Sequence, residues 1–233
     1  MPLNKTEGNM YSFVTHTWNP VKGRCGYGCP YCYAKKINRR FGKQQGEPYL
    51  DEKELAANLG EGNHIFVCSS CDLFHDDIPG EWIRRVMEKA NSSYNRFLWH
   101  TKNPRRALEF RDHFFNTDML CVTIESDLES GASIAPSRWE RFAEIVRWGK
   151  PWMLTIEPVM DFDLFGFAAN IAMNMPAQVN IGADSGRNSL PEPSPEKLQA
   201  LIDWLEPRTK VHLKKNLRRI LPERRLHGKA GAK

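Results

Sequence analysis

The chain has 233 residues, of which 41% are hydrophobic and 11% aromatic. That is enough for one domain with a substantial core. The most apolar stretch, residues 166–183, is interrupted by Asn170, Asn174 and Pro176, so we expect no membrane span. No apolar run follows a basic flank at the N-terminus, which predicts no signal peptide.

Six cysteines, three of them clustered, do not resemble the disulfide framework of a secreted protein. A reducing cytoplasm is therefore the expected setting. The net charge of +5 is unevenly placed, because residues 206–233 hold ten Lys or Arg against two Glu.

The basic segment at residues 214–233 is expected to form a C-terminal tail that binds an anionic partner, with nucleic acid as the first candidate. Arg218, Arg219, Arg224 and Arg225 suit phosphate contacts. The alternative is a solvated helical face with a frayed end, since no known nucleic-acid-binding motif accompanies the charge.

Short apolar runs alternate with segments of helical periodicity along the chain. We expect strands at residues 11–17, 64–68, 96–100, 119–124, 152–156, 178–181 and 211–213, and helices at residues 33–41, 52–59, 81–90, 105–114, 137–148, 164–173 and 194–205. This alternation predicts βαβ units with a parallel sheet. The expected fold is α/β, a partial (β/α)6-type barrel over residues 1–213 with helices outside.

Polar residues recur directly after the expected strands. In a barrel, the carboxyl ends of the strands form the rim that carries the active site. We therefore expect these side chains at one rim: Asp72, Lys102, Glu125, Glu157, Asp184 and Lys214.

A glycine-rich loop at residues 23–33 carries Cys25, Cys29 and Cys32, spaced Cys-x3-Cys-x2-Cys. Its glycines allow the backbone to bring three thiols together. A structural zinc site normally has four protein ligands, and His16, Cys68 or Cys71 could supply the fourth. A [4Fe–4S] cluster held by three thiolates instead leaves one iron open to a small molecule.

The cysteine motif, with Tyr31 directly before its third cysteine, resembles that of the radical S-adenosylmethionine (radical SAM) superfamily. The flanking Trp18-Asn19-Pro20 and Cys32-Tyr33-Ala34 are similar to small, phage-associated radical-SAM-like proteins. The resemblance implies a partial barrel, a [4Fe–4S] cluster on the three cysteines, S-adenosylmethionine as cofactor and an external electron donor. It also implies that a 5′-deoxyadenosyl radical abstracts hydrogen from the substrate.

Further residues are assigned from the resemblance and from their positions after the expected strands. Superfamily members carry Gly-Gly-Glu after the second strand, where this chain has Ser69-Ser70-Cys71-Asp72. Tyr31, Ser70, Asp72 and Glu125 are expected to contact the cofactor. Cys71, Lys102 and Glu157 are expected to be catalytic, and the Cys71 thiol is expected either to donate a hydrogen atom to a product radical or to act as an extra cluster ligand.

Ordinary structural roles compete with several of these assignments. Asp72 could cap a helix, and Glu125, Glu157, Lys102 and Lys214 could form rim salt bridges or carry ordinary surface charge. Four further residues are expected to be mainly structural, either in the core or through hydrogen bonds: Cys68, Cys121, His75 and His100.

The substrate is expected to be a nucleic acid or nucleotide, and in outline the chain resembles spore photoproduct lyase, a radical SAM enzyme that acts on DNA. A peptide or protein partner is the next possibility. The competing hypothesis is a non-catalytic nucleic-acid-binding module with a structural zinc or a redox-sensing metal site.

Overall fold

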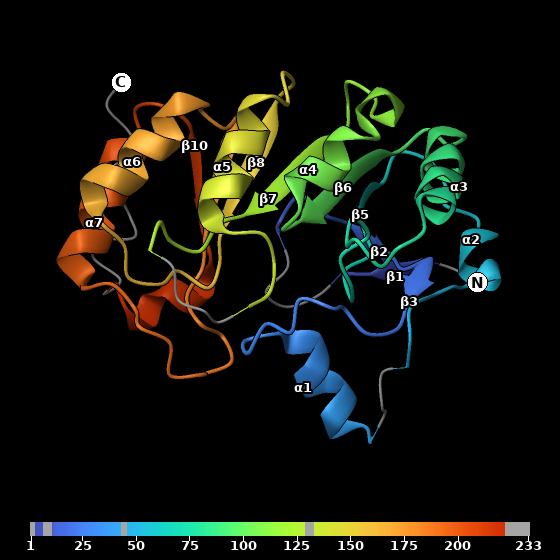
Figure 1. The fold of residues 1–233 in the computed structure, drawn as a ribbon, viewed down its shortest axis with the longest axis horizontal. Coiled ribbons are helices and arrows are strands. Elements are labelled where there is room, and N and C mark those ends of the chain that lie inside the picture. The colour runs from blue at the N-terminus through green and yellow to red at the C-terminus, as the bar shows by residue number, and fades with distance from the viewer. Residues whose placement is uncertain (1–2, 7–10, 43–45, 129–132, 222–233) are drawn as a thin grey trace.

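A computed structural model describes residues 3–6, 11–42, 46–128 and 133–221. Its main feature is a curved sheet of eight strands with helices along its outer face (Figure 1). All neighbouring strands are parallel except the first pair, β1 and β2. In sheet order the strands are β1 (Asn4–Lys5), β2 (His16–Trp18), β5 (His64–Val67), β6 (Arg96–Thr101), β7 (Met119–Thr123), β8 (Trp152–Ile156), β9 (Gln178–Ile181) and β10 (Lys210–Leu213).

No ladder joins β10 to the β1 edge within the described residues, so the sheet forms an incomplete barrel. A separate two-stranded ladder pairs β3 (Val21–Lys22) with β4 (Tyr49–Leu50). The α-helices are α1 (Tyr33–Arg40), α2 (Glu52–Leu55), α3 (Gly80–Asn91), α4 (Pro104–Leu108), α5 (Arg138–Val146), α6 (Leu164–Met173) and α7 (Pro195–Leu205), and short 3-10 helices span Arg111–His113 and Lys215–Arg219.

The expected α/β architecture is confirmed, and most elements lie where the periodicity placed them. The strand expected at residues 11–17 is wrong for its first part, because the chain turns at Ser12 and Phe13 and pairs only from His16. Tyr11 and Val14 are instead buried against the inner face of the sheet. Their β-forming side chains therefore serve packing rather than strand pairing.

Two helices are shorter than expected. The segment at residues 105–114 divides into α4 and a 3-10 turn, and α2 ends at Leu55. On α5, Phe142 and Ile145 face the core, whereas Trp139 is 57% exposed.

The main core lies between the outer face of the sheet and its helices. Fully buried strand residues such as Ile65, Trp99 and Leu154 pack there against helix residues such as Val86. The core extends past residue 213, because Leu217 and Leu221 are fully buried. Residues 222–233, including Arg224 and Arg225, lie outside the described part.

Candidate functional site

The inner face of the sheet leads directly to the rim. Register pairs Thr123 with Thr155 and Asn180 with His212, so these side chains share one face. Side chains alternate along a strand, so residues two positions further on point the same way. Because the strands are parallel, their carboxyl ends meet at one end of the barrel, which we call the mouth. Four of the predicted rim residues lie there on the inner face: Lys102, Glu125, Glu157 and Lys214.

Glu125 is the centre of the rim. It is 1% exposed, and its carboxylate accepts hydrogen bonds from the Tyr31 hydroxyl and the Lys102 ammonium. Arg141 Nη1 lies 3.0 Å from Glu125 Oε2, and Arg138 Nε lies 3.7 Å from the same oxygen. The cysteine loop, β7 and α5 are thus joined through one carboxylate.

Burial alone raises the pKa of Glu125, but Lys102 and Arg141 outweigh it and hold that pKa well below its usual range. A carboxylate enclosed by cations stays ionised at neutral pH. Because both oxygens are occupied by protein donors, the geometry favours a role in fixing Tyr31 and Lys102. Direct contact between Glu125 and the cofactor stays a prediction.

A second ion pair lies across the mouth. Lys214 Nζ is 2.5 Å from Glu157 Oε2 and 4.5 Å from the centre of the Tyr11 ring. A Cβ at Gly182 would lie 2.6 Å from the Glu157 carboxyl carbon, so a larger residue there would require the Glu157 side chain to shift. The Glu157 side chain is 17% exposed, against 2% for Glu125, so Glu157 is the more accessible carboxylate.

Below the rim, the barrel interior contains polar side chains. The Tyr11 hydroxyl lies 2.8 Å from Thr155 Oγ1, and the Cys121 thiol lies 3.0 Å from the same oxygen. Burial, with Lys102 and Lys214 nearby, lowers the pKa of His100 to about 3. His100 is therefore neutral, with Nε2 2.5 Å from Thr123 Oγ1. These contacts agree with the structural roles expected for His100 and Cys121.

The cysteine loop is held against the rim by its own backbone and by two neighbours. Gly23 and Gly28 have φ of +105° and +68°, which glycine adopts without strain. The Tyr27 ring packs 4.3 Å from the His75 ring, and Ser133 Oγ donates to the Tyr27 carbonyl at 3.0 Å. A Cβ at Gly26 would overlap the His75 ring. The loop therefore packs directly against the segment that follows β5 in the chain.

The three thiols of the loop are free, and Cys29 is buried while Cys25 and Cys32 are partly exposed. Burial and the nearby Asp72 carboxylate raise the pKa of Cys25 to about 11. No group of three or more His, Cys, Asp or Glu side chains converges on a single metal ion within the described residues. In a [4Fe–4S] cubane each thiolate binds a different iron. A single loop with three free thiols therefore fits a [4Fe–4S] cluster.

The segment after β5 is organised by Asn19. Its Oδ1 accepts from Ser69 Oγ at 3.1 Å and from the Ser70 amide at 3.3 Å. The Cys71 thiol donates to the Val21 carbonyl at 3.3 Å. A hydrogen bond with Cys68 and burial raise the pKa of Cys71, so the two thiols are neighbours.

Asp72 lies beneath this segment and is nearly buried. It accepts from the Phe74 amide at 3.0 Å, the Lys102 amide at 2.8 Å and Thr101 Oγ1 at 2.8 Å. Desolvation raises the pKa of Asp72 despite these bonds. The carboxylate thus ties the end of β5 to the end of β6, which favours its structural role over contact with the cofactor.

Several contributors were not identified from the sequence. The position of Arg141 in a helical segment indicated a solvated cation, and the position of Tyr11 indicated a strand residue. Asn19 and Gly26 belong to recognised motifs, but nothing in the sequence names their partners, Ser69, Ser70 and His75. Asp184, predicted for the same rim, lies in the loop that follows β9 and accepts there from the Gly186 amide at 3.0 Å.

The fold and this rim define the class: an α/β partial barrel with a loop of three free cysteines at the carboxyl ends of its strands. The chain belongs to the family described as protein of unknown function (DUF5131), whose model matches residues 9–193. No curated protein matches it in sequence.

Solved structures of spore photoproduct lyase share the fold. A cysteine-to-serine variant has a TM-score of 0.54 and 12% identity, covering 89% of this chain and 66% of that chain. A structure with bound AdoMet and dinucleoside spore photoproduct has a TM-score of 0.54 and 12% identity, covering 87% and 64%. This chain therefore spans about two-thirds of the lyase's length.

No helix among the described residues combines the length and the apolar character needed to span a membrane.

Proposed function

We propose that this protein is a radical SAM enzyme that acts on a nucleic acid or nucleotide. The observation that carries the proposal is the position of the cysteine loop. Its three free thiols lie beside the rim of a partial barrel whose fold is shared with spore photoproduct lyase. The structure of that lyase with AdoMet and a dinucleoside supports both the cofactor and the substrate class.

Cys25, Cys29 and Cys32 would hold a [4Fe–4S] cluster. A cluster bound there and reduced by an external electron donor would supply the electron for cleavage of S-adenosylmethionine to methionine and a 5′-deoxyadenosyl radical, and that radical would abstract hydrogen from a substrate. The protein supplies binding, orientation and shielding. Tyr31, fixed by Glu125, limits the freedom of the loop between Cys29 and Cys32.

The rim charges are placed to orient a zwitterionic cofactor and an anionic substrate. Glu157, the more accessible of the two rim carboxylates, and its partner Lys214 are proposed to contact these groups directly. Lys102, whose side chain is 13% exposed, is held by Glu125 and lies 5.3 Å from the centre of the Tyr31 ring. Ser70 and Asp72 are proposed to shape the cofactor side of the mouth.

Cys71 is proposed as the hydrogen donor to the product radical. The residue is partly exposed, and the raised pKa of its thiol keeps the S–H bond intact at neutral pH. In the step, the S–H hydrogen atom passes to the substrate radical and leaves a thiyl radical. The external electron donor and a proton from solvent then restore the thiol.

Iron binding tests the metal assignment. After anaerobic reconstitution with iron and sulfide, the Cys29→Ala variant should lose its cluster and keep its circular dichroism. Cys121→Ala, which removes a thiol buried in the barrel, is the matched control and should keep full iron content. Equal iron in both variants, or zinc in place of iron, would refute the assignment and favour the binding module.

A further inference from the structure

Helix α1 carries an apolar stripe that nothing in the described structure covers. Tyr33, Ile37 and Phe41 follow one another at intervals of four residues, at and just beyond the helix, so they share a face. They are 52%, 47% and 67% exposed. Within α1 only Ala34 is buried, so the helix contributes little to the core.

The same helix is strongly cationic. Lys35, Lys36, Arg39 and Arg40 lie on it, and its sequence contains no acidic residue. Lys36 and Arg40 are three residues after Tyr33 and Ile37, which places both cations along one edge of the stripe. Lys35, Arg39 and Arg40 form no ion pair with the described residues. We call Tyr33, Ile37 and Phe41, together with Lys36 and Arg40, the basic aromatic surface; Lys35 and Arg39 follow Tyr33 and Ile37 by two residues and lie on the other side of the helix.

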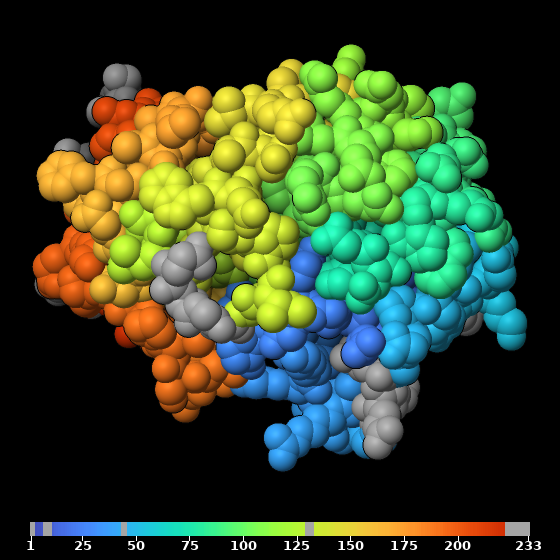
Figure 2. Space-filling model, viewed as in Figure 1, coloured from blue at the N-terminus to red at the C-terminus, as the bar shows by residue number. Residues whose placement is uncertain are grey.

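The basic aromatic surface stands beside the mouth of the barrel. The helix begins directly after Cys32, and the Tyr33 hydroxyl donates to the Ser69 carbonyl after β5. Lys36 Nζ donates at 2.7 Å to the Gly186 carbonyl after β9. The helix is therefore fixed to two sides of the rim, and it projects from the lower edge of the molecule in Figures 1 and 2.

Two cations of the described part of the C-terminal segment are already engaged by carboxylates. Arg219 pairs with Glu192 and donates to the Asp184 carbonyl at 3.1 Å. Lys214 pairs with Glu157 at the rim, and Leu217 is fully buried. Within the described residues, the cations of α1 are thus better placed than these to meet a polyanion.

We propose that the basic aromatic surface binds a single-stranded stretch of nucleic acid that leads into the barrel mouth. This deepens the proposed function and rests on it for the identity of the mouth. Single-strand binding combines cations that follow the phosphates with aromatic rings that stack on unpaired bases. Helix α1 carries four cations and no acidic residue, which favours a polyanion over an apolar protein groove as the ligand. Aromatic side chains stack only on unpaired bases, so the nucleic acid is expected to be single-stranded.

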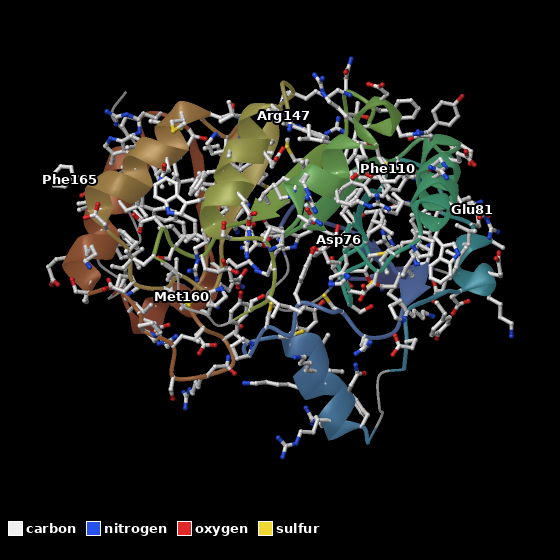
Figure 3. All side chains as sticks on the ribbon, viewed as in Figure 1. Asp76, Glu81, Phe110, Arg147, Met160 and Phe165 are labelled. Atoms are coloured by element: carbon white, nitrogen blue, oxygen red, sulfur yellow. The ribbon has the colours of Figure 1, made fainter. Side chains whose placement is uncertain are left out.

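Binding is measured by fluorescence anisotropy on the full chain as purified, with a fluorescein-labelled oligo(dT) of about 15 nucleotides. Phe41→Ala should weaken binding by roughly tenfold, through loss of one stacked base. The matched control is Phe165→Ala on α6, which removes an aromatic ring that is 85% exposed and projects away from the sheet (Figure 3). That variant should bind as the wild type does.

The electrostatic part has its own pair of variants. Arg40→Gln should reduce the slope of log affinity against log salt by about 0.7, the contribution of one phosphate contact on a single strand. The control, Arg84→Gln, removes the same charge from an exposed position on α3. Its slope should equal that of the wild type.

Three results would overturn the inference: no binding by the wild type, unchanged binding by the α1 variants, or equal loss in the controls. If Phe41→Ala disrupts a complex with a partner protein but binds the oligonucleotide as the wild type does, α1 is a protein-docking helix instead. The assay requires neither cluster nor cofactor. If the protein forms 5′-deoxyadenosine but does not bind the oligonucleotide as described, only this inference is refuted. If it binds the oligonucleotide but takes up no cluster, only the proposed chemistry is refuted.

Discussion

The Tyr31 hydroxyl donates a hydrogen bond to the buried carboxylate of Glu125. This contact joins the cysteine loop to the end of β7, and Glu125 is itself held by Arg141 from α5 at 3.0 Å. The position of the loop is thus set by the sheet and its outer helix. A loop fixed before metal binding needs little rearrangement to present its thiols.

Removing the Tyr31 hydroxyl should loosen the loop. Tyr31→Phe takes one donor from an ionised carboxylate, and such bonds contribute about 1.5–3 kcal/mol. The expected result is lower unfolding free energy and faster amide hydrogen exchange at residues 25–32. Tyr33→Phe, which removes a hydroxyl bonded to the Ser69 carbonyl, is the control. Unchanged exchange in Tyr31→Phe would show that the hydrogen bond does not position the loop.

Neutralising Glu125 should be among the most destabilising single changes at the rim. Glu125→Gln leaves Lys102 and Arg141 without their counter-charge, and breaking a buried pair costs about 3–5 kcal/mol. Glu157→Gln should cost less, because its carboxylate is more exposed. Denaturant unfolding at neutral pH measures both, and equal costs would contradict the central place of Glu125.

The same variant has a defined pH dependence. The pKa of Glu125 is depressed in the folded protein, so its contribution is complete above the unfolded pKa of about 4.3. It is lost as pH falls from there toward the lower folded pKa. The stability difference between wild type and Glu125→Gln should therefore be constant from pH 6 to 8 and shrink below about pH 4. A difference that grows on acidification would contradict the assigned shift.

Gly26 is expected to be indispensable for steric reasons alone. A Cβ there overlaps the His75 ring, and overpacking costs about 1–3 kcal/mol. Gly26→Ala should lower both stability and iron uptake, and the double variant Gly26→Ala/His75→Ala should recover part of each. If the double variant is as impaired as the sum of the two single variants, contact with His75 is not the cause.

Cys71→Ala should separate cofactor cleavage from product formation. The variant keeps the three cluster cysteines, so 5′-deoxyadenosine should still form. With a nucleic acid substrate in D2O, the wild type should place solvent-derived deuterium in the product and Cys71→Ala should not. Deuterium incorporation equal to wild type would exclude the Cys71 thiol as donor, and Cys68→Ala is the neighbouring control.

The sequence predicted the sheet well because its strands are short apolar runs bounded by turns and helices. The rim followed from the same pattern, since Lys102, Glu125, Glu157 and Lys214 each come directly after or near the end of a strand. The first strand was misplaced because Tyr11 and Phe13 have β-forming side chains that instead fill the barrel interior. Apolar pattern alone does not distinguish these two uses of an aromatic residue.

The contacts that organise the site could not be predicted. Tyr31 and Glu125 are 94 residues apart in the chain, and an arginine on a helix, such as Arg141, ordinarily indicates a solvated face. The contacts of Asp72 with the Lys102 amide and with Thr101 were likewise not predicted. Such pairings depend on three-dimensional packing, which spacing along the chain does not encode.

The most direct test of the proposed chemistry is release of 5′-deoxyadenosine. Protein reconstituted anaerobically with iron and sulfide is mixed with dithionite and S-adenosylmethionine, with and without single-stranded oligonucleotide, and the product is measured by chromatography. We expect a brown protein that forms 5′-deoxyadenosine, and a Cys32→Ala variant that stays folded and forms none. A colourless, zinc-containing wild type, or a Cys32→Ala variant as active as the wild type, would contradict the account.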